Sequence, residues 1–457
     1  MSDVRVQQGF GLNLNLCTGC GACVVACAIE NELPWGTSWR WIETFNPDRL
    51  PWLPLHHLSL ACNHCGDAPC MEHCPALAYT KDPVTGAVLL DEEHCIGCKY
   101  CTWACPYDAP RYEPDRGVVS KCTFCHERQL EGHSPACVSQ CPTGALRFGD
   151  VEKLVGSAAV AGFPSTEAAP SARFVPLRGD SAPEPSPWDQ PAQVPPRPAA
   201  SKISLASEWP LVVFTLLSAG LVGLMASAAG RASLSLPVFL AAAGLAGAAS
   251  TLHLGRKLRA WRALLNLRRS WLSREALLFT VFVAGSAWHL SGIGAPDWVG
   301  TASGILGFAL LYAIDRVYDV TRTPGVTVHS GRTLLTGMLA ATLVAGATAA
   351  WMGIAGLKAA LYLRRKWRGG VPWRPAWAVV RLAGGLVAGP ALFVMTASPW
   401  WVATALALLV LGEVVDRCEF YQDLTVPTPA RQIREDLTRM LAERGEALPR
   451  GPKLQGG

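Results

Sequence analysis

Long apolar stretches dominate the second half of the chain. Most of them are close to the ~20 residues that a helix needs to cross ~30 Å of hydrocarbon. They are apolar on every side and carry tryptophans near their ends, whereas buried helices of a soluble protein would keep a polar face. The pattern predicts an all-α polytopic transmembrane helix bundle over residues 208–420, with spans visible at 209–230, 234–252, 276–293, 299–314, 333–353, 377–397 and 400–415.

The first part of the chain, residues 1–150, has short strand-like segments separated by turns. In one example the turn-forming residues 81–86 precede the apolar segment 87–90, and such alternation is typical of small strands and hairpins. The repetition of this pattern predicts a small α+β domain.

Two further segments have compositions that do not build a core. Residues 151–207 are rich in Pro, Ala and Ser, most densely between Pro183 and Pro198, and this composition favours extended conformations, so we expect a linker. Residues 421–457 are predicted to form a polar C-terminal tail.

Charge suggests how the bundle is oriented. Residues 255–274 carry seven basic side chains, whereas the turns after the first and third spans carry only Arg231 and no basic residue, respectively. Since basic loops face the cytoplasm, we expect a multi-pass protein of the inner membrane with its first domain on the cytoplasmic face. The first residues show no export pattern, which favours the same side; transport of the folded domain is the alternative,.

The number of spans stays open on these grounds. A count of seven places the basic residues 364–366 on the opposite side, while an eighth crossing or a re-entrant turn within 333–363 would bring them back. The net charge of +5 lies mostly beside apolar segments, so it indicates membrane flanks and no nucleic-acid partner.

Sixteen of the 17 cysteines form four groups of four between residues 17 and 141. The spacing of the first and third groups matches the bacterial ferredoxin run, as does the proline after the last cysteine of the second, third and fourth groups. In that run three thiolates on one loop hold a cubane and the fourth cysteine reaches the partner cluster. Zinc favours CxxC pairs without a close third sulfur, and disulfides need an oxidising compartment. The spacing therefore predicts an α+β double ferredoxin-like (4Fe–4S) domain with four [4Fe–4S] clusters as cofactors, held by Cys17, Cys20, Cys23, Cys27, Cys62, Cys65, Cys70, Cys74, Cys95, Cys98, Cys101, Cys105, Cys122, Cys125, Cys137 and Cys141.

Several basic residues lie close to these cysteines in sequence. Lys99, Arg111 and Lys121 could raise the reduction potential of a nearby cluster by adding positive charge,. Our interpretation from sequence is the simpler one, that all three are solvated surface residues.

The cysteine motifs and parts of the second half are recognisable together. Cys62-Asn63-His64-Cys65, the segments 95–101 and 105–107, Lys121-Cys122 and Cys141-Pro142 resemble the iron–sulfur subunit of dimethyl sulfoxide reductase-type molybdoenzymes, over about residues 8–150. Shorter motifs resemble the membrane anchor of that family, at residues 208–211, 252–255, 273–275, 316–318 and 411–413.

The resemblance implies a fused electron-transfer and anchor subunit that works with a separate molybdopterin catalytic subunit and with quinone in the membrane. It also implies that the first cysteine group pairs with the fourth and the second with the third. Cys101 is present where some relatives have lost a cysteine and hold a three-iron cluster, which favours four-iron clusters throughout. The implied ligand sets are Cys17, Cys20, Cys23 and Cys141; Cys27, Cys122, Cys125 and Cys137; Cys62, Cys65, Cys70 and Cys105; and Cys74, Cys95, Cys98 and Cys101.

Two titratable residues are candidates for a quinone site. His253 and Glu275 bracket the basic loop, on the expected side of the cluster domain, and proton-handling groups are needed beside a quinone. The alternative is that both are interfacial residues that reach water or pair with loop arginines. No haem is expected, because only His253 and His289 lie in or beside spans, and His289 is toward the opposite end.

Other functions remain to be weighed against this one. Related complexes act on sulfite, polysulfide or tetrathionate, or are haem-free formate dehydrogenase- or hydrogenase-like assemblies, and no pterin site in this chain distinguishes among them. A scaffold role would not need four clusters. Ion pumping would need buried carboxylates along several spans, whereas from sequence the middles of the spans are expected to be nearly free of charge apart from Arg381.

Overall fold

The computed structural model describes residues 6–50, 52–178, 202–321, 328–368, 373–395 and 399–446. The chain divides into two compact units. The first contains residues 1–95, 99–200 and 427–457, and the second contains residues 96–98 and 201–426. The densest part of the predicted linker, between Pro183 and Pro198, lies outside the described residues.

A three-stranded sheet joins distant parts of the first unit. Its central strand β1 (Gln8–Asn13) pairs antiparallel with β8 (Leu146–Asp150) and parallel with β9 (Ala172–Val175). Phe10 of β1 lies opposite Phe148 of β8, and both rings contact Phe124. This aromatic cluster packs the two ends of the cysteine-rich segment together. Through β9 the sheet includes residues of the region predicted as linker.

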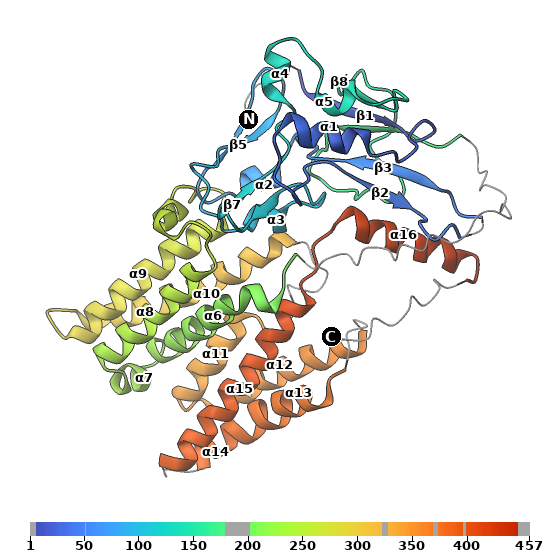
Figure 1. Cartoon of the computed structure of the whole chain (residues 1–457). Coiled ribbons are helices and arrows are strands. Elements are labelled where there is room, and N and C mark those ends of the chain that lie inside the picture. The colour runs from blue at the N-terminus through green and yellow to red at the C-terminus, as the bar shows by residue number, and fades with distance from the viewer. Residues whose placement is uncertain are drawn as a thin grey trace. The chain divides into compact units, whose positions relative to one another are not determined.

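Short hairpins and short helices make up the rest of the cysteine-rich domain (Figure 1). The predicted segment 87–90 contains β5, and the turn before it is held by the Asp82 carboxylate, which accepts the N–H groups of Val84 and Thr85. The predicted α+β ferredoxin-like class is confirmed. The hairpins are β2 (Trp41–Phe45) with β3 (His56–Leu60), β4 (Tyr79–Lys81) with β5 (Val88–Leu90), and β6 (Arg111–Glu113) with β7 (Val118–Ser120); the helices are α1 (Ala22–Glu30), α2 (Pro69–Glu72), α3 (Tyr100–Ala104), α4 (His126–Leu130) and α5 (Ala136–Ser139).

The C-terminal segment contributes a helix to this first unit. α16 (Pro429–Glu443) begins at the cap residue Thr428, whose side chain accepts the N–H of Arg431, and it packs against β2. Asp436, buried in this helix, accepts the N–H of Gly162 at 2.8 Å. The segment expected to be a polar tail therefore includes a packed amphipathic helix.

The second unit is a helical bundle, which confirms the predicted class (Figure 1). Three of its described helical segments are long and apolar enough to cross a membrane, Leu205–Met225, Asp297–Thr321 and Pro375–Phe393, and a fourth is Leu236–Leu252 if it is counted with Lys257–Leu264 across a bend of 101°. The elements are α6 (Leu205–Met225), α7 (Ala228–Ser233), α8 (Leu236–Leu252), η1 (Lys257–Leu264), α9 (Trp271–Ser291), α10 (Asp297–Tyr318), η2 (Asp319–Thr321), α11 (Thr333–Val344), α12 (Thr348–Arg368), α13 (Pro375–Val379), the π-helical η4 (Val380–Ala388), α14 (Gly389–Met395) and α15 (Pro399–Asp423).

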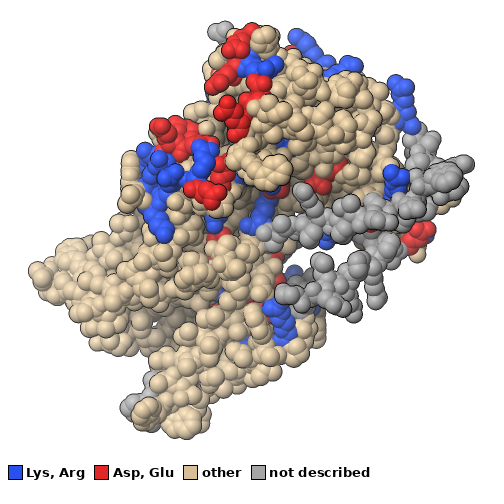
Figure 2. Space-filling view, in the orientation of Figure 1, with Lys and Arg blue, Asp and Glu red and all other residues tan. Residues whose placement is uncertain are grey.

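The outer face of this bundle suits a lipid environment. Figure 2 shows no acidic or basic side chains over α8 and α14. Large apolar side chains of α8 and α10, such as Val238, Leu245 and Ile305, are exposed by 58–67%. Lipid can cover such surface, whereas water would penalise it.

A tight turn divides the apolar stretch 333–353 into two helices. Gly346 has a φ of +68° and its N–H bonds the carbonyl of Leu343, so α11 ends and α12 returns beside it. As a result Arg365, near the end of α12, contacts His329, which precedes α11. The turn that would bring residues 364–366 back is therefore present.

Candidate functional site

Cysteines from the first and fourth groups line a common pocket. Cys17 and Cys20 lie on the loop that leads into α1, Cys23 lies in the first turn of α1, and Cys141 faces the same pocket of about 310 Å³. Gly19 has a φ of +70° and packs against the His57 ring, where a Cβ would lie 2.9 Å from ring atoms. The loop can therefore take its tight path only with glycine at this position.

A second pocket combines the second and third groups. Its volume is about 350 Å³ and its lining includes Cys62, Cys65, Cys70 and Cys105. Pro69 starts α2 and so directs Cys70 into the pocket wall,. Among the described residues no three His, Cys, Asp or Glu side chains form a site for a single metal ion; the cysteines surround larger volumes.

The remaining cysteines also interact across groups. Burial raises the pKa of the Cys27 thiol to about 12, and the thiols of Cys137 and Cys125 add to the effect. Burial likewise raises the pKa of Cys74, to which Cys95 contributes. Thiols with such pKa values stay protonated at neutral pH unless a metal displaces the proton.

Arg40 tests whether these pockets suit an iron–sulfur cluster. It is 1% exposed, its Nη1 donates to the Oγ and the carbonyl of Ser59, and its guanidinium lies 4.4 Å from the centre of the Phe10 ring. Its Nε and Nη2 have no hydrogen-bond acceptor among the described residues. Burial opposes its charge, yet neighbouring sulfurs, led by Cys137 and Cys122, raise the pKa of Arg40. The sulfur atoms of a bound cluster would supply the missing acceptors, so the residues present fit such a group.

The two candidate quinone residues lie at one end of the helical bundle. His253 follows α8 as its C-terminal cap residue, and Glu275 is buried near the start of α9, just after its first turn. These helices pack against each other. Arg417 of α15 and Asp315 of α10 interact electrostatically with Glu275, so a cation from α15 acts on the predicted site.

Both parts of the chain are similar to known protein families. Residues 54–151 match the model of a 4Fe-4S dicluster domain, and residues 204–359 match the dimethyl sulfoxide reductase anchor subunit (DmsC). The probable anaerobic dimethyl sulfoxide reductase chain YnfG of Escherichia coli K12 is 40% identical over 159 residues, which cover 33% of this chain and 77% of the relative. The chain belongs to the dimethyl sulfoxide reductase family.

Members and relatives of the dimethyl sulfoxide reductase family with other substrates are also similar. A sulfite dehydrogenase subunit of Allochromatium vinosum is 37% identical over 166 residues, covering 32% of this chain and 69% of the relative. The thiosulfate reductase electron transfer subunit PhsB of Salmonella typhi is 41% identical over 140 residues, covering 30% and 72%. The expected fusion of an iron–sulfur subunit with an anchor is confirmed by the two domain matches.

The interpretation of Lys121 as a solvated surface residue was wrong. Lys121 is only 3% exposed, and its Nζ donates to the carbonyls of Cys122, at 2.9 Å, and Val88. Sequence alone does not distinguish a buried lysine beside a cysteine motif from a lysine on the surface. Lys99 and Arg111 are half-buried, over the rings of Tyr112 and Trp41.

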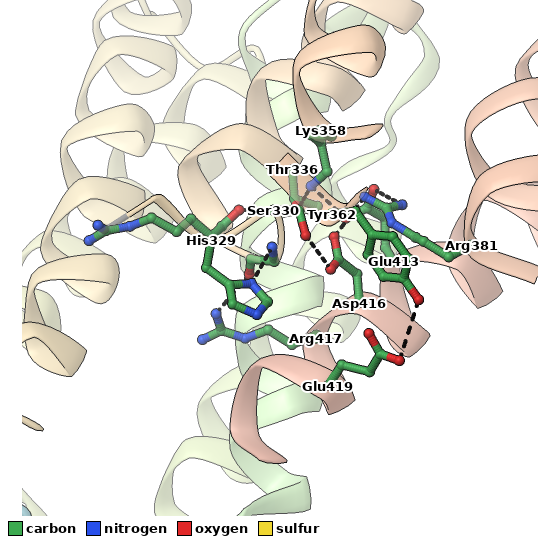
Figure 3. A network of polar contacts seen from close by, with 12 residues as sticks. His329, Ser330, Thr336, Lys358, Tyr362, Arg381, Glu413, Asp416, Arg417 and Glu419 are labelled. Carbon is green, nitrogen blue, oxygen red and sulfur yellow. Dashed lines mark hydrogen bonds and ion pairs between the residues drawn. The ribbon is translucent and has the colours of Figure 1, made fainter. Parts of the chain in front are cut away.

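The expectation of nearly uncharged spans was also wrong. Lys358 of α12, Glu413 and Asp416 of α15, and Arg381 of η4 are all buried and in contact (Figure 3). Lys358 and Arg381 each stand alone in an apolar segment, whereas Glu413 and Asp416 follow one, so the sequence signal was an occasional charged residue in or beside a span,. The structure shows that these residues share one site.

Proposed function

We propose that the chain carries electrons between the membrane quinone pool and a separate molybdopterin catalytic subunit, through four [4Fe–4S] clusters on the sixteen cysteines. The observation that supports this most is the pairing of cysteine groups in two pockets, with Cys141 beside the first group and Cys105 beside the second. Four clusters supply a chain of one-electron carriers. The ligand sets are those implied by the family resemblance.

The protein side chains prepare each site in a specific way. Burial raises the pKa of Cys70 and Cys65, so binding of iron displaces protons that the free thiols would keep. Cys141 differs, because hydrogen bonds from the N–H of Leu146 and from Thr143 outweigh burial and lower its pKa. The buried charges of Arg40 and Lys121 offset the negative charge that gathers at the sulfur ligands.

Quinol oxidation releases two electrons and two protons. We assign the electrons to the clusters and the protons to His253 and Glu275, where an imidazole nitrogen and a carboxylate can accept them. In the reverse direction the same groups donate the protons that quinone takes up.

The terminal substrate is set by the catalytic partner. Because relatives include subunits of sulfite dehydrogenase and thiosulfate reductase, a sulfur-compound enzyme is the second candidate for the complex. Both assignments use the same electron path in this chain.

Cluster content provides a direct test. Protein purified without oxygen should contain about sixteen iron and sixteen acid-labile sulfide atoms per chain, because each of four cubanes holds four of each. Iron and sulfide assays, with electron paramagnetic resonance of the reduced protein, measure this. A content near eight would contradict four clusters.

Orientation is the second test of the proposal. We place the cluster domain on the cytoplasmic face because residues 255–274 carry seven basic side chains,. Leu258 of η1 is 96% exposed, so a Leu258→Cys variant should react with a membrane-impermeant maleimide in inverted vesicles and stay unlabelled in intact spheroplasts. The unsubstituted protein gives the background from its own cysteines. Labelling in spheroplasts alone would place this loop outside.

A further inference from the structure

Opposite charges face each other along α12 and α15. Lys358, Tyr362, Arg365 and Lys366 follow one side of α12, and Glu413, Asp416, Glu419 and Asp423 follow one side of α15. Spacings of three, four and seven residues keep side chains on one helix face. We call the contacts between these two rows, together with Arg381, His329, Ser330 and Thr336, the charge ladder (Figure 3).

The outer part of the ladder lies where α12 and α15 end. The Asp423 carboxylate is 3.2 Å from Arg365 and 3.5 Å from Nε2 of His329, and Glu419 contacts Arg365 and Lys366. The side chain of Asp423 retains 19% exposure. This end of the ladder therefore reaches solvent, beside the residues that precede α11.

The ladder continues from these residues into the bundle. Ser330, next to His329 in sequence, donates to Asp416 at 2.7 Å. Arg381 bridges Asp416 at 2.8 Å and Glu413 at 2.7 Å. Glu413 accepts from Lys358, and Lys358 also donates to Thr336, at 2.9 and 2.8 Å. Lys358 and Arg381 are fully buried, so the exposed fraction falls to zero along the ladder.

Helix attachment alone is a weak reason for such a ladder. Well-packed apolar side chains hold helices together at least as well as a buried ion pair, because charges lose their hydration on burial. Ionisable residues inside a membrane bundle instead mark paths for ions, protons or substrates. The ladder offers carboxylates, an imidazole and hydroxyls, which can take up and release protons.

An apolar cluster lies directly beyond the innermost charges. Leu339, Ala355 and Leu386 pack together and are at most 7% exposed. On α11 and α12 they are one turn farther from the exposed end than Thr336 and Lys358, and on the third helix Leu386 follows Arg381. The ladder is therefore open at one end and closed by this cluster at the other.

We propose that the charge ladder is a proton path that is open only to the end of the bundle holding Asp423, and that the cluster of Leu339, Ala355 and Leu386 stops protons from crossing. The carboxylates of Asp423, Glu419, Asp416 and Glu413, which share one face of α15, hold the proton in turn, while Lys358 stays protonated throughout,. At each step one group loses the proton that the next gains. Arg381 stays charged and holds both carboxylates in place. This goes beyond electron transfer and needs neither quinone nor reduced clusters.

Opening the closed end provides the test. The purified full chain is placed in vesicles with a trapped pH-sensitive dye, and proton entry is followed after a pH step with valinomycin and potassium present. Leu386→Ser should raise the proton leak roughly tenfold or more over the unsubstituted protein, since a tenfold rate needs only a small fall in the barrier. Adding Glu413→Gln, which keeps the shape but not the charge, should return the leak to the starting level. Leu339→Asn provides a second opening of the same cluster.

A matched control separates a path from general damage. Phe282→Ser removes a fully buried apolar side chain from α9, away from the ladder, and should leave the leak unchanged. All variants are compared only when they elute as the unsubstituted protein does in detergent. The proposal is overturned if neither opening variant leaks, if Phe282→Ser leaks equally, or if Glu413→Gln fails to suppress the leak.

Discussion

Arg40 and Lys121 place two positive charges inside a domain whose metal ligands are negative. Both are at most 3% exposed, and neither is neutralised by a carboxylate in the contacts described. Ser59 links Arg40 to the cysteines, since its Oγ lies 2.9 Å from Nη1 of Arg40 and 3.2 Å from Sγ of Cys23. Potentials of iron–sulfur clusters depend on such charges and hydrogen bonds.

Removing the charge of Arg40 should make the adjacent clusters harder to reduce. A reduced cluster carries one more negative charge, which the guanidinium stabilises, so we expect Arg40→Gln to lower the midpoint potential of the clusters on Cys23 and on Cys27 by about 60 mV, a tenfold change for one electron. Redox titration followed by electron paramagnetic resonance measures the shift.

Two substitutions serve as controls for Arg40. Arg40→Lys keeps the charge and should retain most of the potential. Lys153→Gln removes a charge whose side chain is 85% exposed, and it should leave all potentials unchanged because solvent screens it. Unchanged potentials in Arg40→Gln with full iron content would show that this charge does not act on the clusters.

The elements of the anchor meet through small residues where the charge ladder is deepest. Gly412 of α15 and Gly385 of η4 touch backbone to backbone, and a Cβ on Gly412 would lie 2.6 Å from the Cα of Gly385. Close helix approach at small residues is typical of membrane bundles. Here it allows Arg381 of η4 to reach both carboxylates of α15.

Gly412→Ala should therefore destabilise the bundle. The added methyl group meets backbone that cannot rotate away, and overpacking of this kind costs about 1–3 kcal/mol. We expect a lower thermal midpoint in detergent, followed by circular dichroism. Gly356→Ala is the matched control, because Gly356 lies in α12 with open space at its Cβ position, and it should be neutral or slightly stabilising. Equal midpoints for both variants would contradict the close approach.

Some elements could be predicted from sequence and others could not. Cysteine spacing and long apolar stretches are local signals, and they correctly predicted the ferredoxin-like domain and the helical class of the second half, although the stretch 333–353 is divided between α11 and α12. The pairing of Lys358 with Glu413 joins residues 55 positions apart and depends on which helix faces meet. The role of Arg40 has no local sequence signal either, because its contacts with Ser59 and the cysteines form only on folding. The packed helix α16 did have a usable signal, since Ile433, Leu437 and Leu441 recur every four residues and are all buried,.

At the scale of the whole molecule, the clusters can be reduced by quinol only if the protons of quinol are accepted at the same time. His253 and Glu275 are proposed to handle the protons of quinol. His253→Ala or Glu275→Gln should slow quinol-driven reduction of the clusters by roughly one to three orders of magnitude, because a general base is lost. Stopped-flow absorbance of the clusters measures the rate.

The same variants contain their own control. Iron content should stay at the unsubstituted level, and reduction of the clusters by a small dye should keep its rate, because neither involves the quinone. If both variants react with quinol at the normal rate, the quinone site is elsewhere, and Glu413 with Arg316 is the next pair to test.

The position of α16 has a consequence for the order of biosynthesis. Ile433 packs where a Cβ on Gly162 would be, next to Phe45 and Leu58, and Asp436 bonds the N–H of Gly162 across 274 residues. At ~5–20 residues per second, the ribosome needs roughly 15–50 s to make this intervening chain. During that time the helices of the anchor are inserted, and the apolar surface at Phe45 and Leu58 is left uncovered. The iron–sulfur domain is thus translated before the anchor but completed only after it.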